Sequence, residues 1–303
     1  MNDATHHPHE RTGILYAGLA YAIWGIIPLY WRLLGDIPPF QLTVHRILWC
    51  ALFLVGVTAV RGRLAHIVTI FRTRGLLLTL ALTSILISIN WTIFIYCVAT
   101  NQLIEASLGY YLTPLLSIAL GVFLFGEHLS RVRLAGVALA LIAVVIQAAA
   151  FGRIPWIGLS LSLSFGFYGF FRKKAPVDSM DGLFVETMLL FPFTLGLIVY
   201  WGMTEPGAFP ATSFTKDALL IAGGPITAIP LSMFAAGARR MRLSTLGFLQ
   251  YLSPSLTLLL AIFGFGEAFT RADAVSFALI WLALLIVAFD GRFKPAIAVE
   301  EGG

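Results

Sequence analysis

The fold of this chain is indicated by one segment that occurs twice, as YLTPLLSIALGVFLFGEHLSR at 111–131 and as YLSPSLTLLLAIFGFGEAFTR at 251–271. At an offset of 140 positions the copies agree in several residue types, in the pairs Tyr111–Tyr251, Pro114–Pro254, Glu127–Glu267 and Arg131–Arg271. The match extends upstream to Phe94–Phe234 and Leu103–Leu243, and a one-residue slip pairs Gly25 with Gly166. The second half of the chain is therefore predicted to repeat the structure of the first.

The composition predicts that lipid is the main solvent of this protein. Of the 303 residues, 59% are hydrophobic and 12% are charged, with a mean hydropathy of +0.89. Soluble proteins average about 25% charged residues. Because a spanning helix needs about 20 apolar residues, we predict an all-α integral membrane protein with ten transmembrane helices, at 14–34, 41–60, 75–98, 104–125, 133–151, 155–171, 182–201, 217–238, 244–265 and 272–290. The segment 158–171 alternates as a strand does, but a lone strand cannot satisfy its backbone in lipid.

The basic residues predict the orientation of these spans. With the N-terminus in the cytoplasm, 15 of the 20 Lys and Arg residues fall at the cytoplasmic end, and Arg46 lies within a span. Only Arg32, Arg153, Lys216 and Arg271 fall outside. Since cytoplasmic loops are enriched in Lys and Arg, both termini are expected in the cytoplasm, and the net charge of +5 reflects topology rather than nucleic-acid binding.

Five spans per copy is an odd number, so the second copy enters the membrane from the opposite side. We therefore expect two inverted five-helix repeats at 13–151 and 152–290, with cytoplasmic tails at 1–12 and 291–303. Such repeats suit alternating access around a site near the midplane. The glutamates of the repeated corner, Glu127 and Glu267, are expected to contact backbone amides or the nearby Arg131 and Arg271 at a structural turn.

Four stretches carry a family resemblance: AYAIWGIIPLYWRLLGDIPPF at 20–40, ASLGYYLTPLLSIALGVFLFGEHLSR at 106–131, FRKKAPVD at 171–178 and STLGFLQYLSP at 244–254. Together with NW at 90–91, they resemble the RarD family in the EamA branch of the drug/metabolite transporter superfamily. The resemblance covers roughly residues 12–290 and implies ten EamA-like helices, a bacterial inner-membrane location and secondary transport of small metabolites or drugs. The family has no agreed site motif from which roles could be assigned to individual residues of this sequence.

Ionisable groups at membrane depth are costly and usually pair or face a pathway. Near the outer end, we predict an ion pair between Arg46 and Glu105, with His45 as a proton-sensitive neighbour. Near the inner end, Glu186 is predicted to pair with Arg239 or Arg240. These pairs are interpreted either as outer and inner gates or as static fastenings between helices.

A second set of residues is expected to line a substrate cavity near the midplane. Its members are polar or aromatic and lie deep in spans or beside a proline, namely Trp24, Asn90, Trp91, Tyr110, Tyr111, Tyr168, Gln250 and Tyr251. Aromatic walls with a few amides suit an amphipathic or aromatic solute. The alternative is that these rings pack between helices or lie in interfacial belts.

Other classes of protein fit the sequence less well. There is no HExxH, GxSxG or phosphate-binding glycine loop, so neither an enzyme nor an ATP-driven pump is indicated. The two cysteines, Cys50 and Cys97, have no metal-ligand spacing, and we expect no cofactor and no metal. The expected partners are a small-molecule substrate and membrane lipids, without nucleic acid, while the oligomeric state stays open. A non-transporting membrane subunit, a sensor and a channel remain as alternatives.

Overall fold

The structure is a computed structural model that describes residues 7–125, 131–205, 209–210, 213–238, 240 and 249–292. Within these residues the secondary structure is helical and contains no strand, which confirms the all-helical prediction. The long helices are α1 (His7–Arg32), α2 (Pro39–Val60), α4 (Arg74–Ala99), α5 (Leu103–Phe125), α6 (Arg131–Phe151), α7 (Trp156–Lys174), α8 (Ser179–Thr204), α9 (Phe214–Ala238) and α12 (Arg271–Arg292). Helix α7 is the segment whose alternation resembled a strand.

Six helices in the described part of the chain are long and apolar enough to cross a membrane. They are found at Arg11–Arg32, Pro39–Val60, Arg74–Ala99, Leu134–Phe151, Ser179–Thr204 and Phe214–Phe234. With further helices beside them, these segments make the chain a multi-pass membrane protein.

Two elements differ from the sequence prediction. A short helix, α3 (Leu64–Arg72), lies in the connection that was expected to be a basic loop. It forms because Ile67 and Ile70 share one face, which is buried while most of the helix stays exposed. The ninth expected span, 244–265, is described from residue 249 onward as α11 (Leu252–Leu259) followed by one π-helical turn, η1 (Leu260–Gly264).

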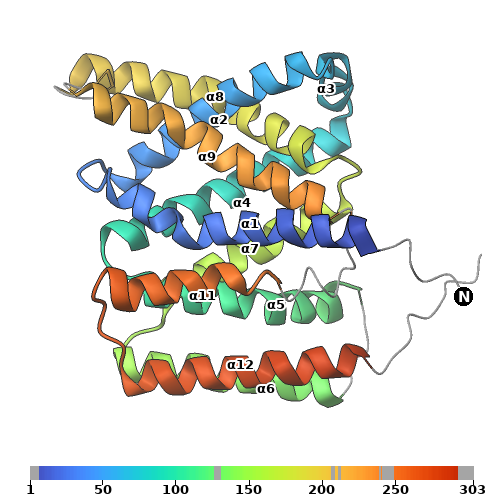
Figure 1. Ribbon diagram of the computed structural model, residues 1–303, viewed down its shortest axis with the longest axis vertical. Helices are drawn as coiled ribbons and strands as arrows, with labels where there is room; N and C mark the ends of the chain where they lie inside the picture. Colours follow the sequence, from blue (N-terminus) through green and yellow to red (C-terminus); the bar gives the residue numbers. More distant parts are fainter. Residues whose placement is uncertain are drawn as a thin grey trace, which may run out of the picture.

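The helices lie side by side in layers, with α6 and α12 paired along one edge of the molecule and α8 at the opposite edge (Figure 1). Between these edges, α1 packs on α9 and α11, while α7 packs on α4 and α5. Helix α2 packs on both α8 and α9. Segments from the two halves of the chain are therefore in contact throughout the centre of the molecule.

Glycines allow the closest of these helix contacts. A Cβ atom on Gly109 of α5 would lie 2.5 Å from the carbonyl oxygen of Gly158 in α7. A Cβ atom on Gly224 of α9 would lie 2.4 Å from the backbone of Trp49 in α2. Small residues at such crossings let two backbones approach and pack in lipid, so the sequence positions of these glycines determine how close the halves come.

The connections divide between two ends of the helix array. At one end, here called the Glu267 end, lie residues 33–38, 100–102, 152–155 and 265–270; Arg32 donates to the Asn101 Oδ1 there, and Lys216 pairs with Asp36. At the other, the Arg63 end, lie residues 61–73 and 175–178. Here an Arg63 Nη lies 2.6 Å from a carboxylate oxygen of the buried Asp181. Both ends are thus closed by polar contacts between helices that are distant in sequence.

Candidate functional site

A buried arginine lies at the junction of the two halves. Arg46, in α2, is only 6% exposed. Its Nε donates to the Thr227 Oγ1 of α9 at 2.9 Å, and this hydroxyl donates in turn to the carbonyl of Gly223. The guanidinium carbon lies 4.0 Å from the ring centre of Trp91 in α4 and 5.2 Å from that of Trp31 in α1. The cation on α2 is therefore held by residues of three other helices, α1, α4 and α9.

The predicted pair between Arg46 and Glu105 is not formed. Glu105 instead accepts from Arg153 Nη2 at 3.0 Å and from the Ile157 backbone N–H at 3.2 Å. The reason is that Glu105 lies on the face of α5 that packs against α7, where the first turn of α7 offers an unpaired amide. Arg46 faces α4 and α9. The expected proton-sensitive neighbour, His45, is buried beside Phe209, with 5.4 Å between the ring centres.

The predicted pairs of Glu186 are also replaced by another partner. Its carboxylate lies 3.4 Å from Arg172 Nε, accepts from the Thr83 Oγ1 at 2.7 Å and from the Tyr168 hydroxyl at 3.4 Å. Arg172 is in the last turn of α7, so its long side chain can reach back to the buried carboxylate. Arg240, just beyond the end of α9, donates to the Ala236 carbonyl in the last turn of that helix. The other predicted partner, Arg239, lies outside the described residues.

Asn90, which was expected in the substrate cavity, joins three helices. It is 1% exposed. Its Nδ2 donates to the Leu161 carbonyl and the Ser164 Oγ of α7, both at 3.1 Å, and its Oδ1 accepts from the Tyr110 hydroxyl of α5 at 3.0 Å. An amide in lipid needs such partners. In this conformation the side chain of Asn90 is therefore engaged by α5 and α7.

The other predicted cavity residues are distributed over separate contacts. Tyr111 of α5 is stacked on Tyr251, next to α11, with 6.0 Å between ring centres, and its hydroxyl bonds Ser255. Trp24 of α1 packs on Phe234 of α9. Trp91 covers Arg46, Tyr168 contacts Glu186, and Gln250 is partly exposed beside Tyr251. The residues of this set do not converge on one cavity in this conformation.

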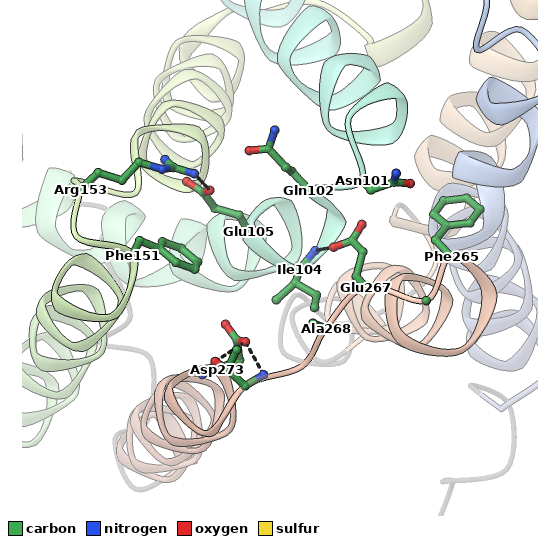
Figure 2. Close-up of a pocket in the computed structure, with 12 residues that line it drawn as sticks. Asn101, Gln102, Ile104, Glu105, Phe151, Arg153, Phe265, Glu267, Ala268 and Asp273 are labelled. Atoms are coloured by element: carbon green, nitrogen blue, oxygen red, sulfur yellow. Dashed lines mark hydrogen bonds and ion pairs between the residues drawn. The ribbon is translucent and has the colours of Figure 1, made fainter.

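A pocket of about 300 Å³ opens at the Glu267 end (Figure 2). Its walls mix polar and apolar side chains from both halves, and the polar ones include Asn101, Gln102, Glu105, Arg153, Glu267 and Asp273. The acids are already engaged. Glu105 holds Arg153, and Asp273 accepts from the backbone and hydroxyl of Thr270 and from Gln147. The acidic side chains in the wall of this pocket are therefore already engaged by protein partners.

The repeated corner acts as a cap on a helix of the other half. Glu267 accepts from the backbone N–H groups of Leu103 at 2.8 Å and Ile104 at 2.9 Å, at the start of α5. Burial raises the pKa of this carboxyl above its ordinary value, and the two amide N–H groups oppose that shift. Glu127 lies outside the described residues. Arg131 and Arg271 are exposed first residues of α6 and α12.

Several partners in these clusters were not singled out from the sequence, namely Thr83, Arg153, Arg172 and Thr227. Arg153 could have been identified from the sequence, since it is one of the four basic residues that the charge pattern assigns to the outer end. Three of those four, Arg32, Arg153 and Lys216, have a polar partner in the structure. The threonines had no signal, because Thr is common in apolar helices.

Comparison with known proteins agrees with this architecture. Residues 11–148 match the model of the EamA-like transporter family. An uncharacterized transporter of Vibrio cholerae is 40% identical over 93% of both chains, and the protein RarD of Escherichia coli K12 is 38% identical over 93% of this chain and 96% of its own. A protein of known crystal structure shares the fold, with a TM-score of 0.58 at 20% identity over 92% of this chain and 98% of that one.

The multi-pass helical fold and the match to the EamA-like family place this chain in the class of membrane transporters. The chain belongs to the EamA-like transporter family, among the RarD proteins. This confirms the resemblance found in the repeated segments. Named relatives of this kind are bacterial transporters, which points away from an enzyme.

Proposed function

We propose that this protein is a secondary transporter of a small metabolite or drug, working by export or exchange through alternating access. The observation that carries the proposal is the packing of the helices. If the halves are exchanged, α1 corresponds to α7, α2 to α8, α4 to α9, α5 to α11 and α6 to α12. The contact of α1 with α9 then corresponds to that of α7 with α4, and the contact of α5 with α7 to that of α11 with α1.

Three further contacts support the same exchange. Helix pairs α2–α8, α5–α11 and α6–α12 map onto themselves. A two-fold axis in the membrane plane would produce this pattern from ten spans in inverted repeats at 13–151 and 152–290. The charge pattern then orients the Arg63 end toward the cytoplasm of a bacterial inner membrane, with both termini inside.

The ion pairs of the two buried glutamates, Glu105 and Glu186, are the proposed gates. Glu105 with Arg153 lies toward the Glu267 end, and Glu186 with Arg172 toward the Arg63 end. The pair of Glu105 with Arg153 joins α5 of the first half to the α6–α7 connection of the second. Glu186 and Arg172 both belong to the second half, but Glu186 also accepts from Thr83 of α4 in the first half. A movement between the halves therefore changes the contacts of both glutamates. The competing interpretation is that they are static fastenings. The double variant Glu105→Arg with Arg153→Glu tests whether the two residues act as a pair. In either interpretation, function should be lost in each single variant and recovered only when both charges are reversed.

The first experiment is counterflow in liposomes that contain the purified protein and are preloaded with pooled metabolites. A carrier accelerates the entry of a labelled pool member when the inside is loaded, whereas a channel does not. A non-transporting subunit or sensor shows neither effect. Protein with native thermal unfolding that exchanges none of the pools would favour the subunit interpretation.

Alternating access is tested by locking one end. In a background where the buried Cys50 and Cys97 are replaced by Ala, Asp36→Cys with Lys216→Cys places two thiols across the Glu267 end. A short bifunctional thiol reagent should abolish counterflow, and a reductively cleavable reagent should allow its recovery. Each single cysteine variant is the matched control. Unchanged counterflow in fully cross-linked protein contradicts the mechanism.

A further inference from the structure

The centre of the molecule has an excess of hydrogen-bond donors and a positive charge without a matching carboxylate. Among the residues that the structure describes, the ion pairs involve other cations, and no acid pairs with Arg46. A guanidinium remains charged in proteins, and an isolated charge at membrane depth is costly. Contact with the faces of Trp91 and Trp31 compensates only part of that cost.

Two donor groups at this position are unused. Within the described residues, Arg46 makes its hydrogen bond through Nε alone, so neither Nη1 nor Nη2 has an acceptor. Trp31, 2% exposed, has an indole N–H that is buried without a hydrogen-bond partner. The guanidinium carbon and the Trp31 ring centre are 5.2 Å apart, so one small ligand can reach both residues.

Neighbouring polar groups are committed elsewhere. The Tyr30 hydroxyl donates to the Leu219 carbonyl, and the Tyr110 hydroxyl donates to Asn90. The Thr227 hydroxyl accepts from Arg46 and donates within its own helix. The unused donors of Arg46 and Trp31 therefore require an acceptor, and the uncompensated guanidinium charge favours one that is negatively charged.

We infer that Arg46 and the Trp31 indole N–H form the anchor of the transported solute, and that this solute is an organic monocarboxylate with a flat apolar body. A carboxylate fits the two parallel Nη donors of an arginine. One negative charge neutralises the single cation, whereas a dianion would leave a charge uncompensated in lipid. The guanidinium covers the Trp91 and Trp31 ring faces in this conformation, and these faces become apolar surface for the rest of the solute when the halves separate.

The position of the anchor fits a carrier. Arg46 belongs to the first half and its hydrogen-bond partner Thr227 to the second, so a ligand here contacts the surface along which the halves move. At 6% exposure, the arginine is closed to both ends in this conformation. Entry therefore requires the halves to separate. The inference rests on the proposed transport function for its meaning but can be tested by binding alone.

The test uses three probes of nearly equal shape: indole-3-acetate, its neutral amide indole-3-acetamide, and the cation tryptamine. Binding is measured as the shift in thermal unfolding of the full chain in detergent, with each probe at millimolar concentration. Indole-3-acetate should stabilise the protein, and the amide and amine should not. Equal stabilisation by all three probes, or no stabilisation by the carboxylate, overturns the inference.

Variants then locate the effect. Arg46→Gln should weaken carboxylate binding about 10- to 100-fold, since a charge-assisted hydrogen bond is replaced by a neutral one. Arg46→Lys should recover part of the loss. If Arg46→Gln does not fold, Trp31→Phe keeps a six-membered aromatic ring and removes the indole N–H together with the pyrrole part of the ring, with a loss of several-fold expected.

Matched controls exist in the same chain. Trp49 also has a buried indole N–H without a partner, but it packs on Phe209, so Trp49→Phe should leave binding unchanged. Arg72→Gln removes an exposed charge and should also have no effect. Equal losses in Trp31→Phe and Trp49→Phe would mean that the change is structural, and would overturn the assignment.

Binding and transport fail separately. If indole-3-acetate binds through Arg46 but no carboxylate shows counterflow, the anchor stands and the transport proposal fails. If other solutes show counterflow that Arg46→Gln does not alter, transport stands and the anchor fails.

Discussion

The hydrogen bond between Tyr110 and Asn90 joins α5 to α4, and its contribution can be isolated by a double-mutant cycle. The Tyr110 hydroxyl donates to Asn90 Oδ1 at 3.0 Å, and Asn90 makes two further bonds to α7. Interhelical hydrogen bonds in membrane proteins average about 0.6 kcal/mol and reach about 1.7 kcal/mol. Tyr110→Phe, which removes one bond, should lower the free energy of unfolding by about that range.

Asn90→Ala removes three bonds together and leaves the Tyr110 hydroxyl buried without an acceptor. We expect a loss of about 2–5 kcal/mol from three bonds of about 0.6–1.7 kcal/mol each. In the Asn90→Ala background, Tyr110→Phe should cost almost nothing, because its bond is already lost. The coupling energy should therefore equal the single shared bond, about 0.6–1.7 kcal/mol.

The assay is reversible unfolding in mixed micelles, followed by helix content, for the wild type, both single variants and the double variant. Tyr200→Phe is the control. Tyr200 is 59% exposed, so this substitution removes a tyrosine hydroxyl without breaking the Tyr110–Asn90 contact. Fully additive losses would refute the reasoning, because two residues that share a hydrogen bond must show coupling.

Three further changes test other contacts. Glu267→Ala removes the cap of α5 and should lower the free energy of unfolding by about 0.5–2 kcal/mol, with a larger rate of amide exchange in the first turn of α5. Gly109→Ala places a methyl group 2.5 Å from a carbonyl of α7 and should cost about 1–3 kcal/mol; Gly196→Ala, with no atom within 4 Å of the added carbon, should not destabilise the protein in the same unfolding assay. The hydrogen bond from Lys216 lowers the pKa of Asp36. The stabilisation of the folded state by this pair is therefore present above the ordinary carboxyl pKa and is lost as the pH falls through the lowered pKa. Asp36→Asn should remove this acid-side dependence, a change of less than about 1 kcal/mol for an exposed pair, measured by unfolding between pH 3 and about 6.

The elements of the fold followed from apolar length and from the repeat. The helical nature of α7 could be predicted because a lone strand has no backbone partners in lipid. Helix α3 was missed because four arginines mark its connection as a loop, while two isoleucines on one face are a weak signal until α4 and α8 provide a surface to cover them.

The candidate site was predicted in its residue types but not in its pairings. The sequence identified Arg46, Glu105 and Glu186 as buried charges, because an ionisable residue within an apolar run is conspicuous at any position. It assigned the wrong partners, since helix rotation decides which face of α5 or α8 meets which neighbour. That rotation depends on the close approach of backbones at residues such as Gly109, which no linear pattern reports.

By itself, therefore, the sequence determined the membrane environment, the family and the repetition of one sequence segment, because these depend on composition and on self-similarity along the chain. Only the tertiary structure decided that Glu105 holds Arg153, that Glu186 holds Arg172 and that Arg46 is left with aromatic rings and a threonine. The physical reason is that each ion pair depends on the distance and rotation between helices, and packing of the whole bundle sets both.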